Sequence, residues 1–276
     1  MPLTPAPLSK FCVHTITTKP LALQQAVAAY REAGVSGITV WRDALQPLGV
    51  ADSAKLLANS GLAVVSLCRG GFFPGATTDA KQKAIDENKR VIDEAAAVGA
   101  PLIVLVCGAV PGIPLADQRK QIADGIAAVV PHAAAANVKL GIEPLHPMYA
   151  GDRSAINTLG QANDVVELIR SPQVGVTIDV YHLWWDERLQ AEIGRAGRAK
   201  SIFSYHVCDW LTPTKDLLND RGLMGDGCVP LRQIRGWVEA AGFDGFIEVE
   251  IFSDRWWATD QAEYLGKIRQ AYEKHV

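Results

Sequence analysis

Four short apolar segments in the second half of the chain each end in a residue that can bind a divalent cation. They read LGIE (140–143), VTID (176–179), FSYH (203–206) and IEVE (247–250). Each is typical of a buried strand, and the strands of a parallel barrel present their carboxyl ends at the face that carries active sites. Three carboxylates and one imidazole favour Mn²⁺, Mg²⁺ or Co²⁺, with Zn²⁺ possible. The segments predict a site for one divalent cation, held by Glu143, Asp179, His206 and Glu250.

The last segment contains two candidates, Glu248 and Glu250. They share a face because strand side chains alternate with a period of two. Glu248 lies one layer deeper, where a carboxylate needs a partner, whereas Glu250 lies nearer the carboxyl end of the strand. We therefore prefer Glu250 as the ligand and interpret Glu248 as a buried supporting group.

Further polar residues follow the predicted strands closely enough to contact a substrate. The candidates are His182, His146 and Asp209, each three residues after a predicted ligand, together with His14 at the end of the first strand and Arg69 just beyond the third. Glycines beside Arg69 permit close backbone approach. Solvated loop or turn positions are the alternative for these residues, and a turn is at least as good an explanation for Asp226 in Gly-Asp-Gly.

Tryptophans flank the same predicted site. Two doublets, at residues 184–185 and 256–257, follow ligand-bearing strands and could cover the apolar face of a sugar ring or pack against another subunit. Trp41 is expected to point away from Arg42, which ends the second strand, and to pack on the outside of the barrel.

These residues require a scaffold of alternating strands and helices. Strands are predicted at residues 11–14, 37–42, 62–67 and 101–106, before the four ligand-bearing strands. Helices are predicted at residues 21–33, 52–59, 79–98, 115–136, 158–169, 188–196, 231–241 and 260–274. Such alternation indicates right-handed crossovers and a parallel sheet, and the length of 276 residues suits a single-domain (β/α)8 TIM barrel over residues 1–276. A doubly wound open sheet is the alternative, although no GxGxxG follows the first strand.

The amino-acid composition narrows the classes of molecule that the protein could bind and the compartment in which it is expected. A net charge of −3 and no Lys/Arg run longer than two residues argue against a general nucleic-acid binder. Five scattered cysteines without a CxxC pair are expected to be mostly buried free thiols in a reducing compartment. The proline-rich amino terminus has no signal-peptide pattern, and no apolar run approaches the ~18 residues of a membrane span. A cytoplasmic protein is therefore predicted.

The motifs together resemble the xylose-isomerase-like barrel superfamily of sugar isomerases and epimerases, including ketose 3-epimerases and hydroxypyruvate isomerase. The likeness extends over nearly the whole chain and rests on GIEP (141–144), DVYH (179–182), HVCD (206–209), GDG (225–227) and GFDGFIEVEIF (242–252). It implies that Glu143, Asp179, His206 and Glu250 hold a divalent cation and that His182 contacts substrate.

The activity expected from these residues is proton transfer next to a carbonyl through an enediolate, with Glu143 and Glu250 as paired base and acid. A free sugar or keto-sugar is slightly preferred over a sugar phosphate, and a homodimer is possible. A lyase or dehydratase begins with the same step and is the first alternative, since the superfamily includes inosose dehydratase and 3-dehydroshikimate dehydratase. An endonuclease IV-like phosphodiesterase and a non-catalytic metal-binding barrel are further alternatives.

Overall fold

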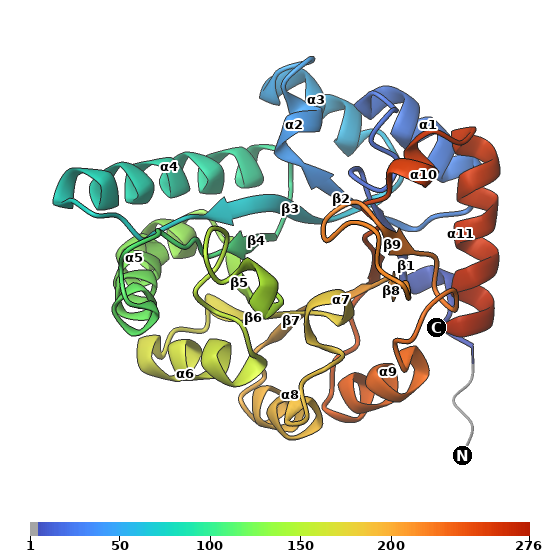
Figure 1. Cartoon of the computed structure of the whole chain (residues 1–276). Coiled ribbons are helices and arrows are strands. Elements are labelled where there is room, and N and C mark those ends of the chain that lie inside the picture. The colour runs from blue at the N-terminus through green and yellow to red at the C-terminus, as the bar shows by residue number, and fades with distance from the viewer. Residues whose placement is uncertain (1–4) are drawn as a thin grey trace.

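The strands hydrogen-bond side by side into a closed barrel. In this computed structural model, which describes residues 5–276, eight parallel strands run in the order β1-β10-β7-β6-β5-β4-β3-β2 (Figure 1). Their bounds are Phe11–His14 (β1), Gly37–Trp41 (β2), Ala63–Gly71 (β3), Leu102–Val106 (β4), Lys139–Glu143 (β5), Val174–Asp179 (β6), Ile202–Val207 (β7) and Ile247–Val249 (β10). The predicted (β/α)8 barrel is confirmed. Because β1 pairs with both β2 and β10, the open doubly wound sheet is excluded.

Helices follow the strands and surround the barrel (Figure 1). Their bounds are Leu23–Glu32 (α1), Val50–Ala58 (α3), Thr78–Ala97 (α4), Leu115–Ala135 (α5), Leu159–Ile169 (α6), Leu189–Arg198 (α8), Leu231–Ala240 (α9) and Gln261–His275 (α11). Thr77, Thr158 and Asp260 accept hydrogen bonds from first-turn amides of α4, α6 and α11. These side chains satisfy backbone donors that a helix start leaves without partners.

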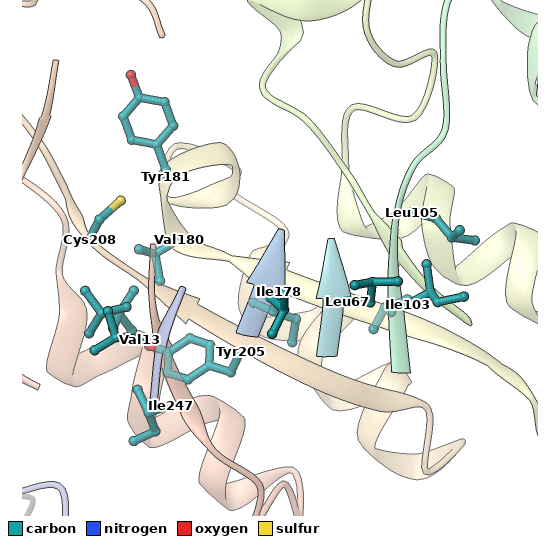
Figure 2. Close-up of a cluster of buried hydrophobic side chains, with 14 of the residues drawn as sticks. Val13, Leu67, Ile103, Leu105, Ile178, Val180, Tyr181, Tyr205, Cys208 and Ile247 are labelled. Atoms are coloured by element: carbon teal, nitrogen blue, oxygen red, sulfur yellow. The ribbon is translucent and has the colours of Figure 1, made fainter. Parts of the chain in front are cut away.

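Alternation along the strands gives the barrel an apolar outer face and a partly polar interior. Apolar side chains from all eight barrel strands belong to the buried core, among them Val13, Leu67, Ile103, Leu105, Ile178, Tyr205 and Ile247 (Figure 2). The intervening positions include Cys12, Thr39, Ser66, Ser204 and Glu248, which are buried and joined by hydrogen bonds. The apolar contacts stabilise the barrel, and the polar interior supports its carboxyl end.

Several short elements lie beyond the predicted pattern. They are the helices Arg42–Leu45 (α2), Val180–Leu183 (α7) and Asp254–Trp257 (α10), the 3-10 helices Leu8–Lys10 and Pro147–Tyr149, and the antiparallel pair Asp209–Trp210 (β8) and Arg221–Gly222 (β9). In addition, β3 continues to Gly71 through what was expected to be a loop. Pairing of Gly70 and Gly71 with β4 extends this strand.

Four of the five cysteines are buried and Cys228 is exposed, and all five are free thiols. This confirms the expectation of mostly buried, unpaired cysteines. Within residues 5–276, no helix combines the length and the apolarity that crossing a membrane would require. The prediction about the amino terminus falls partly on residues 1–4, which lie outside the described residues.

Candidate active site

The four predicted ligand residues converge at the carboxyl end of the barrel. One ligand atom from each of Glu143, Asp179, His206 and Glu250 lies within 4.8 Å of the others, and all four residues are buried. Asp179 and His206 are paired in register between β6 and β7, Glu143 ends β5, and Glu250 lies one residue beyond β10. The barrel brings them together because each occupies the same end of its own strand.

Two of these side chains carry atoms that the protein itself does not satisfy. Oε1 of Glu143 and Nδ1 of His206 are buried without a hydrogen-bond partner and lie 3.3 Å apart. Buried polar atoms nearly always have partners, so such a pair requires an explanation. A divalent cation between the carboxylates and the imidazole would provide one. The residues present therefore fit a metal ion.

The hydrogen bonds of Ser204 assign the protonation of His206. The Ser204 hydroxyl donates its only hydrogen to Oε1 of Glu248, so its oxygen accepts from Nε2 of His206, 2.9 Å away. The proton of a neutral His206 therefore lies on Nε2, and the Nδ1 lone pair faces the carboxylates. A hydrogen bond that fixes the orientation and tautomer of a histidine in this way is typical of metal sites.

Glu248 lies outside the group of four, in a network of its own. Its Oε2 accepts hydrogen bonds from Thr39 (2.5 Å) and Ser66 (3.2 Å), while Ser204 donates to Oε1. Nε2 of His14 lies 3.2 Å from Oε2. Partners on both oxygens make Glu248 part of a closed hydrogen-bond network. The geometry thus favours Glu250 as the residue that faces the other three predicted ligands.

His14 was expected to contact substrate, but it lies beneath the site and joins the two glutamates. Its Nε2 faces Glu248 and its Nδ1 lies 3.0 Å from Oε1 of Glu250. Burial lowers the pKa of His14, but the two carboxylates outweigh it and raise the pKa to about 9. Burial raises the pKa of Glu248, but the nearby His206 and the contact with His14 outweigh it and bring the pKa down to about 2. His14 is therefore a buried cation between two carboxylates.

Arg221, on β9, is a site residue that the sequence analysis missed. One of its nitrogens, Nη1, lies 3.1 Å from Oδ2 of Asp179 and 2.9 Å from Oε2 of Glu250. The guanidinium packs over the rings of Tyr181 and Phe252. Its place in a long loop after β7 gave no periodic signal. Only the fold of that loop brings it to the predicted ligands.

These charges set the ionisation of the predicted ligand residues. Burial raises the pKa of Asp179 to about 7, against the opposing effect of Arg221. Burial also opposes ionisation of Glu250, but His14 and Arg221 hold its pKa well below the usual range. Burial and Arg221 lower the pKa of His182 well below its ordinary value, so its imidazole is neutral. An ionised carboxylate, that of Glu250, and the neutral imidazole of His182 thus line the same cavity.

A cavity of about 360 Å³ adjoins the group of four through Glu143 and Glu250. Glu143, Glu250, His182 and Arg221 line its floor, and Arg69 lies on its wall. His182 and Arg69 thus line the cavity, and their contact with a substrate stays a prediction. Nη2 of Arg221 lies 3.4 Å from Nε2 of His182, which orients the ring.

The expectation that Trp41 packs on the outside was wrong. Its ring lines the cavity, and its indole nitrogen lies 3.3 Å from Nδ1 of His14. Arg42 turns the other way and forms ion pairs with Glu87 and Glu94 of α4. Trp41 shares the inward face of Thr39, two residues earlier in β2, whereas Arg42 begins α2 and leaves the strand.

In each tryptophan doublet, the two side chains have different roles. Trp257 lines the cavity and donates a hydrogen bond to the carbonyl of Ile16, whereas Trp256 is buried and stacks on Tyr264. Trp184 packs against the core. Trp185 donates to the carbonyl of His182 and thereby supports the segment that carries this histidine.

Asp209 and His146 do not line the cavity. The carboxylate of Asp209 accepts hydrogen bonds from the amides of Trp210, Gly225 and Val229, so it holds the loop from which Arg221 emerges. Nδ1 of His146 accepts from the amide of Met148 and caps the short helix after β5. The structure therefore gives both residues loop-supporting contacts in place of the expected substrate contacts. Asp226 lies exposed in a turn.

Comparisons with known proteins agree with this architecture. A crystal structure of a protein from Sinorhizobium meliloti 1021 has a TM-score of 0.93 and 46% sequence identity, over 96% of this chain and 98% of the other. An inosose isomerase of Bacillus velezensis is 22% identical over 244 residues, 84% of this chain and 82% of that protein. A zinc-bound structure of the IolI protein has a TM-score of 0.83 at 21% identity, over 95% and 96% of the two chains, and shows the fold alone.

The family model for xylose isomerase-like TIM barrels matches residues 27–273. This match begins within α1 and ends within α11, so it includes all four predicted ligand residues. The chain belongs to the xylose isomerase-like TIM barrel family.

Proposed function

We propose that this protein is a divalent-metal-dependent isomerase or epimerase of a sugar or keto-sugar. The observation that carries the proposal is the convergence of Glu143, Asp179, His206 and Glu250 beside a cavity that the two glutamates line, with buried ligand-type atoms left unpartnered. Membership of the xylose isomerase-like family and the likeness to an inosose isomerase support the same class of reaction.

The four residues would hold the cation, which supplies Lewis-acid polarisation of a substrate carbonyl and its neighbouring hydroxyl. Three carboxylates with one imidazole favour Mn²⁺, Mg²⁺ or Co²⁺. Zn²⁺ is a further candidate, because the IolI structure contains a bound zinc atom. Ser204 holds the His206 ring so that Nδ1 faces the carboxylates. Arg221 balances part of the negative charge that these carboxylates gather.

Glu250 and Glu143 are the proposed base and acid. His14 and Arg221 keep Glu250 ionised, so a carboxylate oxygen is available to take the proton from the carbon next to the carbonyl. Glu143 comes from β5, which β6 and β7 separate from β10 in the barrel. Return of a proton from Glu143 to the other face of the same carbon gives an epimer, and return to the neighbouring carbon gives an isomer. General acid–base catalysis of this kind contributes about 10²- to 10⁴-fold.

The cavity walls suit a polyhydroxylated substrate. Trp41, Phe252 and Trp257 present aromatic rings, while Tyr149 and Asn219 offer hydrogen-bonding groups. Aromatic rings pack against the C–H face of a sugar, and polar groups distinguish its hydroxyls. We expect the neutral His182, beside Arg221, to hydrogen-bond the substrate.

The first test is proton NMR in D₂O with the Mg²⁺-loaded protein and a panel of ketoses and keto-sugars. The proposal expects deuterium to enter next to a carbonyl and expects a chelator to stop it. The product then distinguishes epimerase, isomerase and the lyase alternative. Bound metal without exchange into any sugar would contradict an isomerase or epimerase of sugars.

Two variants test the assigned roles. In His206→Ala, elemental analysis should show loss of bound metal, and unchanged metal content would contradict the ligand set. In Glu250→Gln, turnover should fall further than substrate binding, because the amide cannot take a proton. Equal losses of turnover and binding would assign Glu250 to binding alone.

A further inference from the structure

Two arginines on the wall of the cavity have no acidic partner. Arg69, near the end of β3, and Arg153, in the loop after β5, both line the cavity and are partly buried. Among residues 5–276, neither guanidinium has a carboxylate within ion-pair distance. Burial and the proximity of Arg153 lower the pKa of Arg69, which shows that the positive charges of the two side chains repel each other. Two neighbouring cations without a counter-ion indicate a site for an anion.

The charges elsewhere in the cavity leave these two arginines uncompensated. Arg221 pairs with Asp179 and Glu250, and a divalent cation would balance the remaining ligand carboxylates. The cavity wall carries two further charged groups, Asp43 and Lys19, whose opposite charges cancel in the sum. Asp43, which is exposed, and Glu143 act on Arg69 only from beyond ion-pair distance. Once the metal site is filled, the cavity therefore carries an excess of positive charge near Arg69 and Arg153.

The backbone fixes both arginines on the same side of the cavity. The amides of Phe72 and Phe73 donate to the carbonyls of Val106 and Cys107, and the amide of Gly108 donates to the carbonyl of Arg153. Gly108 is at φ +95°, and a Cβ there would lie 2.7 Å from Cα of Phe72. Glycine thus permits the close approach of the segment after β4 to the two segments that carry the arginines.

Aromatic rings hold the guanidinium groups in place. Arg69 lies over the rings of Phe72 (4.9 Å) and Trp41 (5.9 Å), and Arg153 lies over the ring of Tyr149 (5.3 Å). Stacking on a ring face orients a guanidinium and leaves its edge free to bind two oxygens. Both cations are therefore positioned before any ligand arrives.

We propose that Arg69 and Arg153 bind a carboxylate of the substrate, which makes the preferred substrate a sugar acid or keto acid. This inference rests on the proposed function, because it places the carboxylate at the end of the substrate away from the carbon that loses its proton. A phosphate fits less well. The amides of Gly71, Phe72 and Phe73, which could have formed a phosphate cradle, already donate to Asn88, Val106 and Cys107.

The test compares three forms of one carbon skeleton. Calorimetric titration of the Mg²⁺-loaded protein would use D-fructose, D-fructuronate and D-fructose 6-phosphate as probes, and then the corresponding tagatose series. The expected result is binding of a uronate about 10- to 100-fold tighter than its neutral ketose, as for hydrogen bonds to a charged group. Tighter binding of the phosphates, equal binding of neutral and acidic forms, or no binding of any probe would overturn the proposal.

Variants connect this preference to the two arginines. Arg69→Met and Arg153→Met keep the apolar part of each side chain and should each lower the preference for the uronate by at least about tenfold. Arg69→Lys should retain more of it. Arg31→Met is the matched control, because Arg31 is exposed on α1 and its loss changes the net charge equally. An unchanged preference in both cavity variants would contradict the assignment. Metal content and thermal unfolding establish that each variant is folded.

These outcomes are distinguishable from failure of the proposed function. Binding is measured without turnover, whereas deuterium exchange measures proton transfer. Exchange into neutral ketoses with no preference for uronates would sustain the isomerase proposal and overturn the carboxylate site. Preferential binding of uronates without exchange would sustain the carboxylate site and overturn the isomerase proposal.

Discussion

Glu248 and Glu250 lie two residues apart at one end of the barrel, yet their surroundings differ. Both oxygens of Glu248 have partners in Thr39, Ser66 and Ser204, with His14 alongside. Glu250 instead faces the cavity and belongs to a cluster in which buried atoms of neighbouring residues lack partners. The deeper layer, formed by Glu248 and its partners, is a complete hydrogen-bond network. The upper layer, formed by Glu143, Asp179, His206 and Glu250, is complete only when a ligand binds.

The difference shows that the same residue types support stability in the deeper layer and ligand binding in the upper layer. A buried carboxylate with a full set of donors contributes a fixed, unique arrangement. Three carboxylates gathered beside one another repel, and a fold tolerates them where a ligand offsets the repulsion. His14 connects the layers, since its two nitrogens face one glutamate from each. The deeper network thereby orients the upper cluster.

The largest effect is expected from Glu248→Gln. This change leaves the buried cation of His14 with one carboxylate fewer and directs amide hydrogens at hydroxyl donors. Removal of one partner from a buried ion pair costs about 3–5 kcal/mol. Urea denaturation of the metal-free protein should therefore show a loss of this size. A loss below about 1 kcal/mol would break the distinction between the layers.

The matched change in the upper layer, Glu143→Gln, should act on metal binding. Oε1 of Glu143 has no hydrogen-bond partner to lose. We expect the free energy of unfolding of the metal-free protein to stay the same or rise, because the change removes one of three carboxylates that repel each other. Metal affinity should fall at least about 100-fold, since even supporting residues cost up to that much. Calorimetric titration with Mn²⁺ measures the affinity. Strong destabilisation without loss of affinity would reverse the two layers' roles.

Ser204→Ala sharpens the comparison, because this hydroxyl joins the layers. The change removes the acceptor of the His206 Nε2–H and a donor to Glu248. Metal affinity should fall about tenfold through loss of ring orientation, and stability should fall by about 1–3 kcal/mol. Both measurements on one sample decide the outcome. An effect on only one of them would show that the layers are independent.

The smallest effect is expected outside the barrel. Thr158 accepts a hydrogen bond from the amide of Gln161 at the start of α6. Thr158→Ala should lower the free energy of unfolding by about 1 kcal/mol. Metal affinity should not change, because this helix start makes no contact with the cluster. Measurable loss of metal affinity would mean that general destabilisation, and not the ligand set, explains the other variants.

Much of the fold follows from local patterns in the sequence. Helix ranges were predicted to within two residues, because apolar periodicity and helix stop signals are properties of contiguous segments. The convergence of Glu143, Asp179, His206 and Glu250 was predictable for a related reason. Each lies at the carboxyl end of a recognisable strand, and a parallel barrel brings such ends together.

The contacts of residues in loops could not be predicted in this way. Arg221 lies in a long connection whose path depends on the hydrogen bonds of Asp209 and on the pairing of β8 with β9. His14 and Trp41 end strands, but whether such a side chain lies beneath a cluster or beside a cavity depends on neighbours distant in sequence. Arg153 reaches the wall of the cavity through Gly108, which lies 45 residues earlier.

The sequence by itself therefore determined the barrel and the residue types at its carboxyl end, because alternation and strand ends are local. The tertiary structure decided which of two neighbouring glutamates faces the cavity and which is enclosed by hydroxyls. It also decided that His14 supports the site, that Arg221 enters it, and that Arg69 and Arg153 lie on one wall. The reason is physical: partners for a buried charge come from several strands and loops, and only their packing in three dimensions assigns them.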